Sequence, residues 1–277
     1  MTELDFSDYL QAPLLGELGT LQTRLARSQA EISLAQSLRY DVFYREMSAR
    51  PSEEVQRSKR DQDDFDPHCD HLLVLDVRRG AAEVVGTYRM MRQPQAMRAG
   101  GFYSQSEFDL APLIAANPGS KLLELGRSCI LSDYRNKRTM ELLWHGTWSH
   151  AVTHSIDIMF GCASFEGTDP NQFADCLAWL GQNAVLSDEE DCPAVAGKQF
   201  SLRDFAAGQS EQVSVRQAMA QMPPMIKGYL RLGARVASWA AVDEQFGTID
   251  VLVVLKVAQI NPRYLAHYGA DASRFTA

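Results

Sequence analysis

The spacing of apolar residues along the chain predicts a mixed sheet with helices on both faces. Apolar or alternating runs favour strands at 23–26, 72–77, 83–91, 122–131, 156–163, 234–241 and 249–257. Apolar residues at helical spacing favour helices at 28–44, 140–152, 170–180 and 225–232. Strands interleaved with helices in this order are typical of a single α/β domain.

Three local signals mark the ends of these helices. Ser28 and Glu31 form the S-x-x-E pattern of a capping box at the start of the first helix. Asp169 and Pro170 suit a helix N-terminus, where the missing N–H of proline has no intrahelical partner to lose. Gly233 is expected to end the last helix.

The remaining segments set the predicted boundaries. Residues 1–20 are expected to form a loosely packed arm, and residues 21–258 the main domain. Residues 47–66 are heavily charged and are interpreted as a mobile, partly helical flap, with a solvated surface loop as the alternative. Residues 181–222 have weak periodicity and are interpreted as an insertion, and residues 259–277 as a tail.

Composition and charge narrow the class of protein. The formal net charge is −8, so the overall charge does not indicate nucleic-acid binding. The five cysteines are scattered without a CxxC pair, which argues against a zinc site or a disulfide framework. The acidic first residues, interrupted by proline, are unlike a signal peptide, and no apolar run reaches the roughly 18 residues of a spanning helix. We therefore expect a cytoplasmic protein.

The segment 122–139 carries the most informative chemistry. Glu124 and Arg127 lie on an apolar strand, and three cations, Arg135, Lys137 and Arg138, follow at the start of a helix. A helix N-terminus attracts anions, so a phosphate group is the expected ligand there. A regular strand would place residues 124 and 127 on opposite faces, and a bulge at Gly126 would bring them together. A buried Glu124 suits a general base, with an ion pair to Arg127 as the alternative.

Six motifs in order resemble one enzyme family. They read LRYDVFYREM at 38–47, DDFDPHCDHLLV at 63–74, FYSQSEFDL at 102–110, LELGRSCILSDYRNKRT at 123–139, LLWHG at 142–146 and FGCASFEGTDP at 160–170. The chain resembles the ornithine–acyl-carrier-protein N-acyltransferases, a hemolysin-like branch of the GNAT acyltransferases. The resemblance implies a single GNAT-like domain. It also implies transfer of a 3-hydroxyacyl group to the α-amine of ornithine, giving lyso-ornithine lipid for aminolipid synthesis.

The resemblance also implies site residues. Glu124 would be the general base, with Arg127 and Ser128 beside it. The acyl-homoserine-lactone synthases are similar more distantly, and they share the positions of Arg39, Phe43, Asp63, Asp66, Glu124 and Arg127. Asp63 and Asp66 would bind the δ-ammonium of ornithine, with a salt-bridge network as the alternative. Arg39 or Arg127 would take the substrate carboxylate, and Phe43 would pack near the acyl or pantetheine region.

One departure from the GNAT pattern concerns the donor. Ordinary GNAT enzymes hold coenzyme A with an R/Q-x-x-G-x-G/A loop, whereas the aligned residues here are Arg135, Asn136, Lys137, Arg138, Thr139 and Met140. Without glycine, backbone amides cannot closely approach a diphosphate. The expected donor is therefore the acyl-phosphopantetheine of acyl carrier protein, an acidic partner, and no permanently bound cofactor is expected.

Other possibilities stay open. The acceptor could be another amino acid such as glutamine, or the chain could act as a lactone-signal synthase. A different class is a non-catalytic lipid-binding or membrane-lytic protein. His150 and His154 lie one helical turn apart, but a third ligand is missing from the pattern, so no metal is expected. The tail could contact the inner membrane peripherally, with an ordinary surface tail as the alternative.

Overall fold

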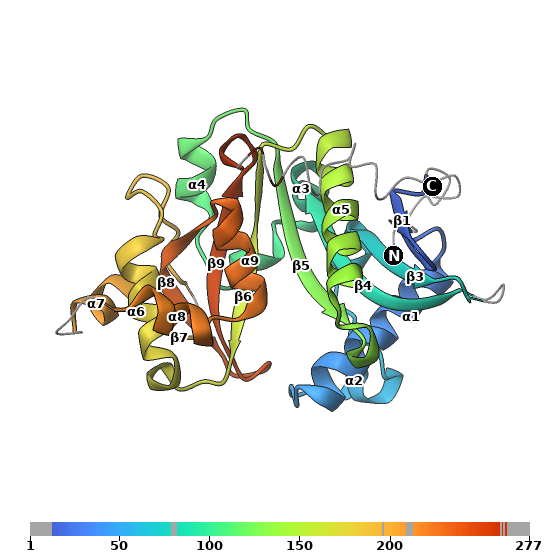
Figure 1. Cartoon of the computed structure of the whole chain (residues 1–277), viewed down its shortest axis with the longest axis horizontal. Helices are drawn as coiled ribbons and strands as arrows, with labels where there is room; N and C mark the ends of the chain where they lie inside the picture. The colour runs from blue at the N-terminus through green and yellow to red at the C-terminus, as the bar shows by residue number, and fades with distance from the viewer. Residues whose placement is uncertain are drawn as a thin grey trace. The chain divides into compact units, whose positions relative to one another are not determined.

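The fold is a mixed sheet with helices on its faces. The computed structural model describes residues 13–78, 82–195, 197–208 and 213–260, together with 262 and 264. Hydrogen-bonded strands follow the order β1-β2-β3-β4-β5-β6-β9-β8-β7 (Figure 1). The predicted α/β class is therefore confirmed. Most of the predicted arm and tail lies outside the described residues.

The chain divides into two compact units. The first comprises Met1–Gly101, Leu125–Ile156 and Pro262–Ala277, and the second comprises Phe102–Glu124 and Asp157–Asn261. Strand β5 (Leu122–Ile130) contributes residues to both. Each unit has its own strands and its own helices. The two are described separately below.

Antiparallel strands build the first unit. They are β1 (Gly16–Leu18), β2 (Leu21–Leu25), β3 (Asp70–Asp76) and β4 (Glu83–Arg92). The predicted hairpin of β3 and β4 is confirmed, while Arg79 and Gly80 of its turn lie outside the described residues. Strand β1 lies within residues 1–20, the segment that was expected to form a loosely packed arm. The backbone of β1 pairs with that of β2, so this part of the segment belongs to the sheet.

Two helices cover the two faces of these strands. On α1 (Gln29–Tyr40), Ile32 and Ala35 pack against Leu73 and Leu75 of β3. Successive strand residues point to opposite faces, so Leu72 points the other way. There it meets α5 (Lys137–Thr153) beside Gly146, where an added Cβ would lie only 2.7 Å from Thr23 Oγ1. The absence of a side chain at Gly146 lets α5 approach the sheet.

The N-terminus of α1 follows half of the predicted capping pattern. Ser28 Oγ accepts a hydrogen bond from the Glu31 N–H at 3.2 Å. The Glu31 carboxylate accepts instead from the Arg27 backbone N–H and from the Arg24 guanidinium, a charged donor that makes a stronger hydrogen bond than a backbone N–H. The helix continues as the π-helix η1 (Asp41–Glu46), so the predicted end near residue 44 is close to the observed one.

The charged segment 47–66 differs from its interpretation as a solvated flap. It holds a short helix, α2 (Glu53–Ser58), and leads into the 3-10 helix η2 (Asp66–His68), as partial helicity predicted. However, Asp61 and Asp66 are only 3% exposed. Their charges are compensated by arginines elsewhere in the first unit, which the local charge pattern cannot reveal. Helix α3 (Gln93–Ala99) follows β4.

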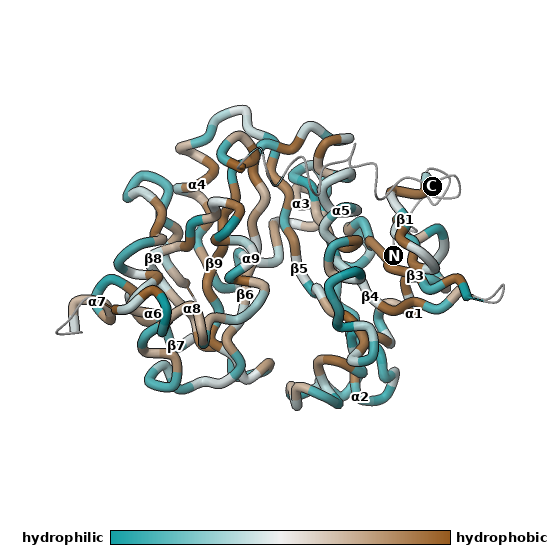
Figure 2. The backbone as a smooth tube through the Cα atoms, in the orientation of Figure 1, coloured by the Kyte–Doolittle hydropathy of each residue, from teal (hydrophilic) through white to brown (hydrophobic). Residues whose placement is uncertain are grey.

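The second unit is a mixed arrangement around β6 (Ile158–Glu166). Residues 122–124 of β5 pair with β6 in parallel, from Leu122↔Ile158 to Glu124↔Phe160. Antiparallel strands β9 (Thr248–Lys256), β8 (Arg235–Asp243) and β7 (Lys198–Ser201) complete it. Figure 2 shows hydrophobic stretches along β8 and β9, in agreement with their buried residues.

Short helices connect these strands. They are η4 (Tyr103–Ser106), α4 (Ala111–Ala116), η6 (Pro170–Phe173), α6 (Ala174–Asn183), α7 (Leu202–Ala207), α8 (Val215–Gln221) and α9 (Pro224–Leu232). Asp169 caps η6, and Gly233 ends α9 with a φ of +101°, as predicted. The predicted insertion contributes β7 to the sheet. No described helix has the length and hydropathy of a membrane span.

Gly181 is predicted to be a packing constraint in the second unit. A Cβ at this position of α6 would overlap the Leu202 carbonyl oxygen and lie 3.1 Å from the Ala206 Cβ. Gly181→Ala should therefore lower the free energy of unfolding by about 1–3 kcal/mol. Gly228→Ala on α9 is the control, because its Cβ would meet nothing within 4 Å. It should raise that free energy by up to about 1 kcal/mol. Urea denaturation measures both, and an equal effect of the two substitutions would contradict the packing argument.

Candidate active site

Strand β5 has an irregular residue at Arg127. Its φ is +54°, in the left-handed region that side chains other than glycine seldom adopt. Such a residue interrupts the alternation of a strand, as a bulge does. An interruption between Glu124 and Arg127 was expected, but at Gly126. The unusual conformation costs about 1–3 kcal/mol, so the contacts of the Arg127 side chain must help to hold it.

Glu124 is a buried carboxylate held by backbone donors of the second unit. It is 5% exposed, and its two oxygens accept the N–H groups of Tyr103 at 2.9 Å and Ser104 at 2.6 Å. These donors belong to the first turn of η4. Each carboxylate oxygen can accept about two hydrogen bonds. The arrangement therefore fixes the orientation of the Glu124 carboxylate.

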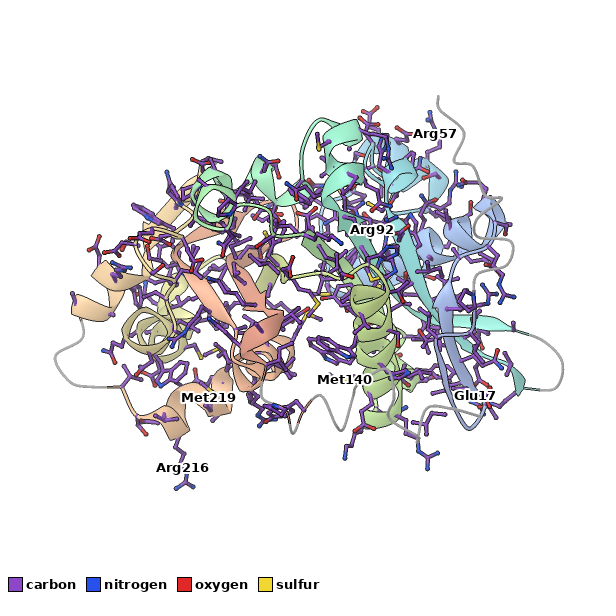
Figure 3. All side chains as sticks on the ribbon, turned by 90° about the horizontal axis from the view of Figure 1, so that it is seen from above. Glu17, Arg57, Arg92, Met140, Arg216 and Met219 are labelled. Carbon is purple, nitrogen blue, oxygen red and sulfur yellow. The ribbon has the colours of Figure 1, made fainter. Side chains whose placement is uncertain are left out.

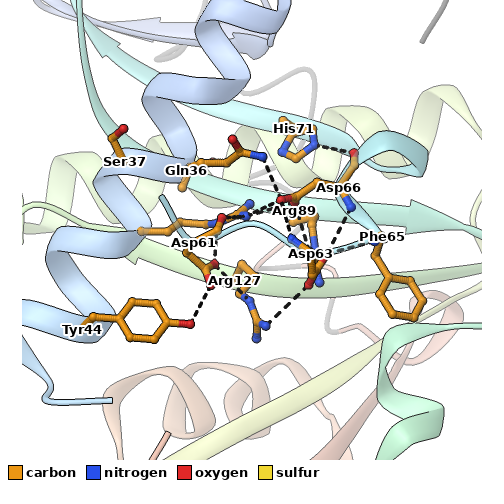
Figure 4. Close-up of polar contacts among 12 residues, drawn as sticks. Gln36, Ser37, Tyr44, Asp61, Asp63, Phe65, Asp66, His71, Arg89 and Arg127 are labelled. Atoms are coloured by element: carbon orange, nitrogen blue, oxygen red, sulfur yellow. Dashed lines mark hydrogen bonds and ion pairs between the residues drawn. The ribbon is translucent and has the colours of Figure 1, made fainter. Parts of the chain in front are cut away.

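Arg39 is the centre of a buried ion-pair network in the first unit. Figure 4 labels its partners Asp61 and Asp66. The Arg39 side chain is 1% exposed and donates to Asp61 at 2.8 Å and to Asp66 at 2.8 Å. From β4, Arg89 reaches Asp63 at 2.6 Å and Asp66 at 3.0 Å. The network thus joins α1, the flap and β4.

Arg127 adds β5 to the same network. Its guanidinium lies 3.2 Å from Asp61 and 3.6 Å from Asp63. Tyr44 donates to Asp61 at 3.0 Å, and Gln36 donates to Asp66 at 2.9 Å. Three guanidinium groups, from Arg39, Arg89 and Arg127, therefore face three carboxylates, from Asp61, Asp63 and Asp66. The formal charges cancel, which reduces the cost of burial.

Asp63 and Asp66, the two acids predicted to bind the substrate ammonium, differ in how far arginine and glutamine side chains already contact their carboxylate oxygens. Both Asp66 oxygens accept from arginine, and Oδ2 also accepts from Gln36. This favours the alternative, a structural network, for Asp66. The side chain of Asp63 is 25% exposed. Its Oδ2 lies 3.6 Å from the Arg127 guanidinium, which is farther than the 3.2 Å between Arg127 and Asp61. Its substrate role stays a prediction.

Electrostatics support the ionised state of Asp66. Burial acts to raise its pKa, but the Arg39 and Arg89 guanidinium groups outweigh burial and hold the pKa well below its ordinary value. Burial works against the charged form of Arg39, and the Asp66 and Asp61 carboxylates outweigh it, raising the pKa of Arg39. Asp66 and Arg39 are therefore both charged at neutral pH.

The start of α5 holds the cations predicted to bind phosphate. Asn136 caps the helix and accepts from the N–H groups of Arg138 at 3.0 Å and Thr139 at 3.2 Å. Arg135 forms a two-point ion pair with Glu46. Lys137 lies 3.7 Å from Glu141 but is 80% exposed on its side chain. Two of the expected cations, Lys137 and Arg138, are thus exposed, while Arg135 is already paired.

The other predicted residues occupy packing positions. Phe43 is half-buried and packs against the cluster of Leu38, Val42 and Cys129. Ser128 follows Arg127 on β5 and is half-buried. Their roles toward substrate stay predictions.

Cysteine and histidine side chains have structural surroundings. Burial raises the pKa of the Cys129 and Cys162 thiols, so both are protonated at neutral pH and are poor nucleophiles. His145 Nε2 lies 2.9 Å from the Leu15 carbonyl oxygen, and His150 lies 3.3 Å from Asp70. The His150–His154 spacing therefore does not produce a ligand cluster among the described residues.

Sequence reasoning missed two members of the network, Asp61 and Arg89. Arg89 could have been predicted to be buried and paired, because it is a charged residue in the apolar strand β4, as Glu124 is in β5. The burial of Asp61 could not have been predicted, because its neighbours in the sequence are also charged. Only its buried position distinguishes it.

The acetyltransferase (GNAT) domain family matches residues 38–145, which places the chain among the acyltransferase enzymes with this domain. Curated relatives make the assignment more specific. Over 267 residues, the chain is 50% identical to an L-ornithine N(alpha)-acyltransferase from Rhizobium meliloti (strain 1021), covering 95% of this chain and 89% of the relative. The chain belongs to the L-ornithine N(alpha)-acyltransferase family.

Two further comparisons give one more relative and one solved structure. The protein of the same name from Brucella abortus (strain 2308) is 45% identical, over 98% of this chain and 96% of the relative. Among solved structures, the coenzyme-A-dependent acyl-homoserine lactone synthase BjaI matches 87% of this chain and 83% of its own, with 15% identity and a TM-score of 0.43.

Asp66→Asn is predicted to destabilise the first unit. It removes one charge from a neutral buried network, so the free energy of unfolding should fall by about 3–5 kcal/mol at pH 7. The folded-state pKa of Asp66 is lowered, so its contribution is present above the unfolded pKa and is lost as pH falls. The difference in free energy of unfolding between the wild type and the variant should therefore become smaller below about pH 4.

Urea denaturation at pH 7 and at lower pH values measures this. Asp64→Asn is the matched control, because Asp64 is exposed two residues away. A variant as stable as wild type at pH 7, or a gap unchanged at low pH, would contradict a stabilising role for the Asp66 charge.

Proposed function

We propose that the protein transfers a 3-hydroxyacyl group from acyl carrier protein to the α-amine of L-ornithine, giving lyso-ornithine lipid for aminolipid synthesis. The observation that carries this proposal is the family assignment, since relatives 37–50% identical over nearly the whole chain are named L-ornithine N(alpha)-acyltransferase. The buried acid on β5 supports it with a group suited to the chemistry.

The reaction is aminolysis of a thioester. The neutral α-amine attacks the thioester carbonyl, a C–N bond forms, and the C–S bond breaks. The amine loses a proton, and the departing pantetheine thiolate gains one. Because the α-amine of an amino acid is mostly protonated at neutral pH, a base that removes a proton from the substrate is needed.

Glu124 is the proposed general base, acting directly or through a water. The Tyr103 and Ser104 N–H groups hold its carboxylate in one orientation. Arg127 is the proposed ligand of the ornithine carboxylate, because its side chain is 14% exposed whereas that of Arg39 is 1% exposed. The network would then position Arg127, and Ser128 would hydrogen-bond the amine or the carboxylate.

The donor is proposed to dock at the start of α5. Lys137 and Arg138 are exposed there and would attract the phosphopantetheine phosphate and the acidic carrier. Thr139 is buried and Asn136 caps the helix, so these two would shape the site rather than contribute charge. Because the donor brings its own phosphopantetheine, no resident cofactor is required. A cytoplasmic location with peripheral membrane contact stays a prediction.

Glu124→Gln tests the proposed base. The amide keeps the size of the side chain but replaces one accepting oxygen by an NH₂ donor, so it can accept only one of the Tyr103 and Ser104 N–H groups. It also cannot accept a proton at neutral pH, so kcat should fall by about 10²–10⁴-fold. Thiol release from 3-hydroxyacyl-acyl-carrier-protein, with ornithine present or absent, measures the rate, and mass spectrometry identifies the product.

The expected result is ornithine-dependent release in the wild type and its loss in the variant. A kcat of Glu124→Gln equal to that of the wild type would refute the role of Glu124 as the general base. Release without ornithine, at an unchanged rate, would indicate a thioesterase and contradict the proposed transfer.

Lys137→Ala and Arg138→Ala test the donor site. Each should raise the KM for the acyl carrier protein several-fold with little change in kcat, and the effect should shrink at high salt because the attraction is electrostatic. Arg216→Ala is the charge-matched control, since Arg216 projects from α8 into solvent (Figure 3). An equal change in KM for Arg216→Ala would point to net charge rather than to a local site.

A further inference from the structure

Residues 213–242 are a part of the second unit where positive charge gathers. They contain the cations Arg216, Lys227, Arg231 and Arg235 and no aspartate or glutamate, although the whole chain has a formal net charge of −8. Helices α8 and α9 and most of β8 lie in this segment. A locally positive surface on an acidic protein points to an anionic partner, because the charge of the chain as a whole repels one.

Helices α8 and α9 lie next to each other. The Cys176 thiol of α6 donates a hydrogen bond to the Ala218 carbonyl oxygen of α8 at 3.3 Å. Burial and the neighbouring Asp175 raise the pKa of this thiol to about 11, and the Lys227 charge of α9 acts against them. One thiol thus lies close to both helices, and Figure 1 shows both on one side of β8 and β9. Their cations therefore belong to one surface.

The cations of α8 and α9 have no ion pair within the described part of the chain. Elsewhere, exposed arginines contact aspartates, as Arg78 does at 2.6 Å and Arg203 does at 2.7 Å. By contrast, Arg216, Lys227 and Arg231 form no ion pair with a described residue. Lys227 and Arg231 lie four residues apart on α9, where like charges repel each other. An anionic surface against this side of the helix would offset that repulsion.

Exposed apolar side chains accompany these cations. Val215 in the first turn of α8 is 59% exposed, and Met225 in the first turn of α9 is 36% exposed. The buried side of α9 is formed by Ile226 and Tyr229, so Met225 is not needed there. Figure 3 shows the Arg216 side chain extending away from α8. The outer side of the two helices therefore combines positive charge with apolar groups, the two properties that attach a protein surface to anionic lipid.

We propose that the outer side of α8 and α9 binds the surface of a bilayer that contains anionic phospholipid. Arg216, Lys227 and Arg231 contact the headgroup phosphates, and Val215 and Met225 enter the boundary between headgroups and acyl chains. With three cations and two apolar side chains, the attachment is weak and reversible. The sequence suggested a peripheral contact through residues 259–277, most of which lie outside the described residues.

The choice of lipid over the acidic carrier protein rests on the proposed function. The phosphopantetheine phosphate of the carrier has its own proposed cations, Lys137 and Arg138, at the start of α5. The proposed product carries a fatty acyl chain, which is more stable in a bilayer than in water. An enzyme that takes both substrates from water and makes such a product gains from a weak contact with the bilayer that receives it.

Co-sedimentation of the full chain with vesicles tests the surface. Vesicles of phosphatidylcholine alone are compared with vesicles of phosphatidylcholine and phosphatidylglycerol in equal parts. The wild type should bind only the anionic vesicles, and salt should weaken the binding. The triple variant Arg216→Gln, Lys227→Gln and Arg231→Gln should lower the partition coefficient about 100-fold, since each cation near an anionic surface contributes several-fold.

Two further variants separate local effects from net charge. Arg57→Gln, Arg98→Gln and Lys121→Gln combined remove the same charge from exposed positions outside α8 and α9, and the partition coefficient should change less than about threefold. Val215→Ser combined with Met225→Ser should lower it several-fold at every salt concentration, because the apolar contribution is not screened.

Acyl transfer without vesicles completes the test. The triple variant of α8 and α9 should keep the wild-type kcat, which also shows that it is folded, and the wild-type KM for acyl carrier protein. A raised KM would assign this surface to the carrier and overturn the inference. A wild type that ignores anionic vesicles, or an equal loss in the charge-matched control, would overturn it as well. Because vesicle binding needs no turnover, an absence of acyl transfer with vesicle binding intact would refute only the proposed function.

Discussion

The network of Arg39, Arg89 and Arg127 with three aspartates is the constraint on which the first unit depends. It buries charge from four separate parts of the chain: α1, the flap, β4 and β5. Such a network is stable only when it is complete, because removal of one member leaves an uncompensated buried charge. Its balance of three cations and three anions therefore links the position of the flap to the conformation of β5.

Arg127 is the member of the network that lies on β5. The residue adopts a left-handed conformation three positions after Glu124, and its guanidinium is held by Asp61 and Asp63. The network thus supplies the contacts that offset the strain at Arg127. Glu124 is fixed independently, by the N–H groups of η4. Two unrelated sets of interactions therefore orient the two residues that β5 contributes to the proposed site.

Much of the fold could be predicted from the sequence, because its signals are local. A few neighbouring residues are enough to predict the strands β3, β4 and β5 from their apolar pattern. The same holds for the helix that begins after Asp169 and the helix that ends at Gly233. Glu124 could be found because an acid in an apolar strand must be buried. The same reasoning applies to Arg89 and Asp250, because each is a charged residue in an apolar strand.

The rest could not be predicted because it depends on distant partners. Asp61 is surrounded by charged neighbours in sequence, and its burial depends on Arg39 and Arg127, which are distant from it in sequence. The carboxylates of Glu107 and Asp250, whose oxygens lie within 4.8 Å of each other, come from segments more than a hundred residues apart, and only the register of β6 and β9 places Asp250 beside Ser164. On β5 a bulge was considered at Gly126, whereas the left-handed residue is Arg127, because the contacts that compensate its conformation leave no trace in the sequence pattern.

The central claim is that the acyl group is transferred to the α-amine of ornithine. The most direct measurement uses ornithine labelled with ¹⁵N at the α-position, the wild-type enzyme and 3-hydroxyacyl-acyl-carrier-protein, followed by fragmentation of the product in a mass spectrometer. The account predicts an amide that contains the ¹⁵N atom and a free, unlabelled δ-amine. An amide at the unlabelled δ-nitrogen, or released fatty acid without an amide, would contradict it.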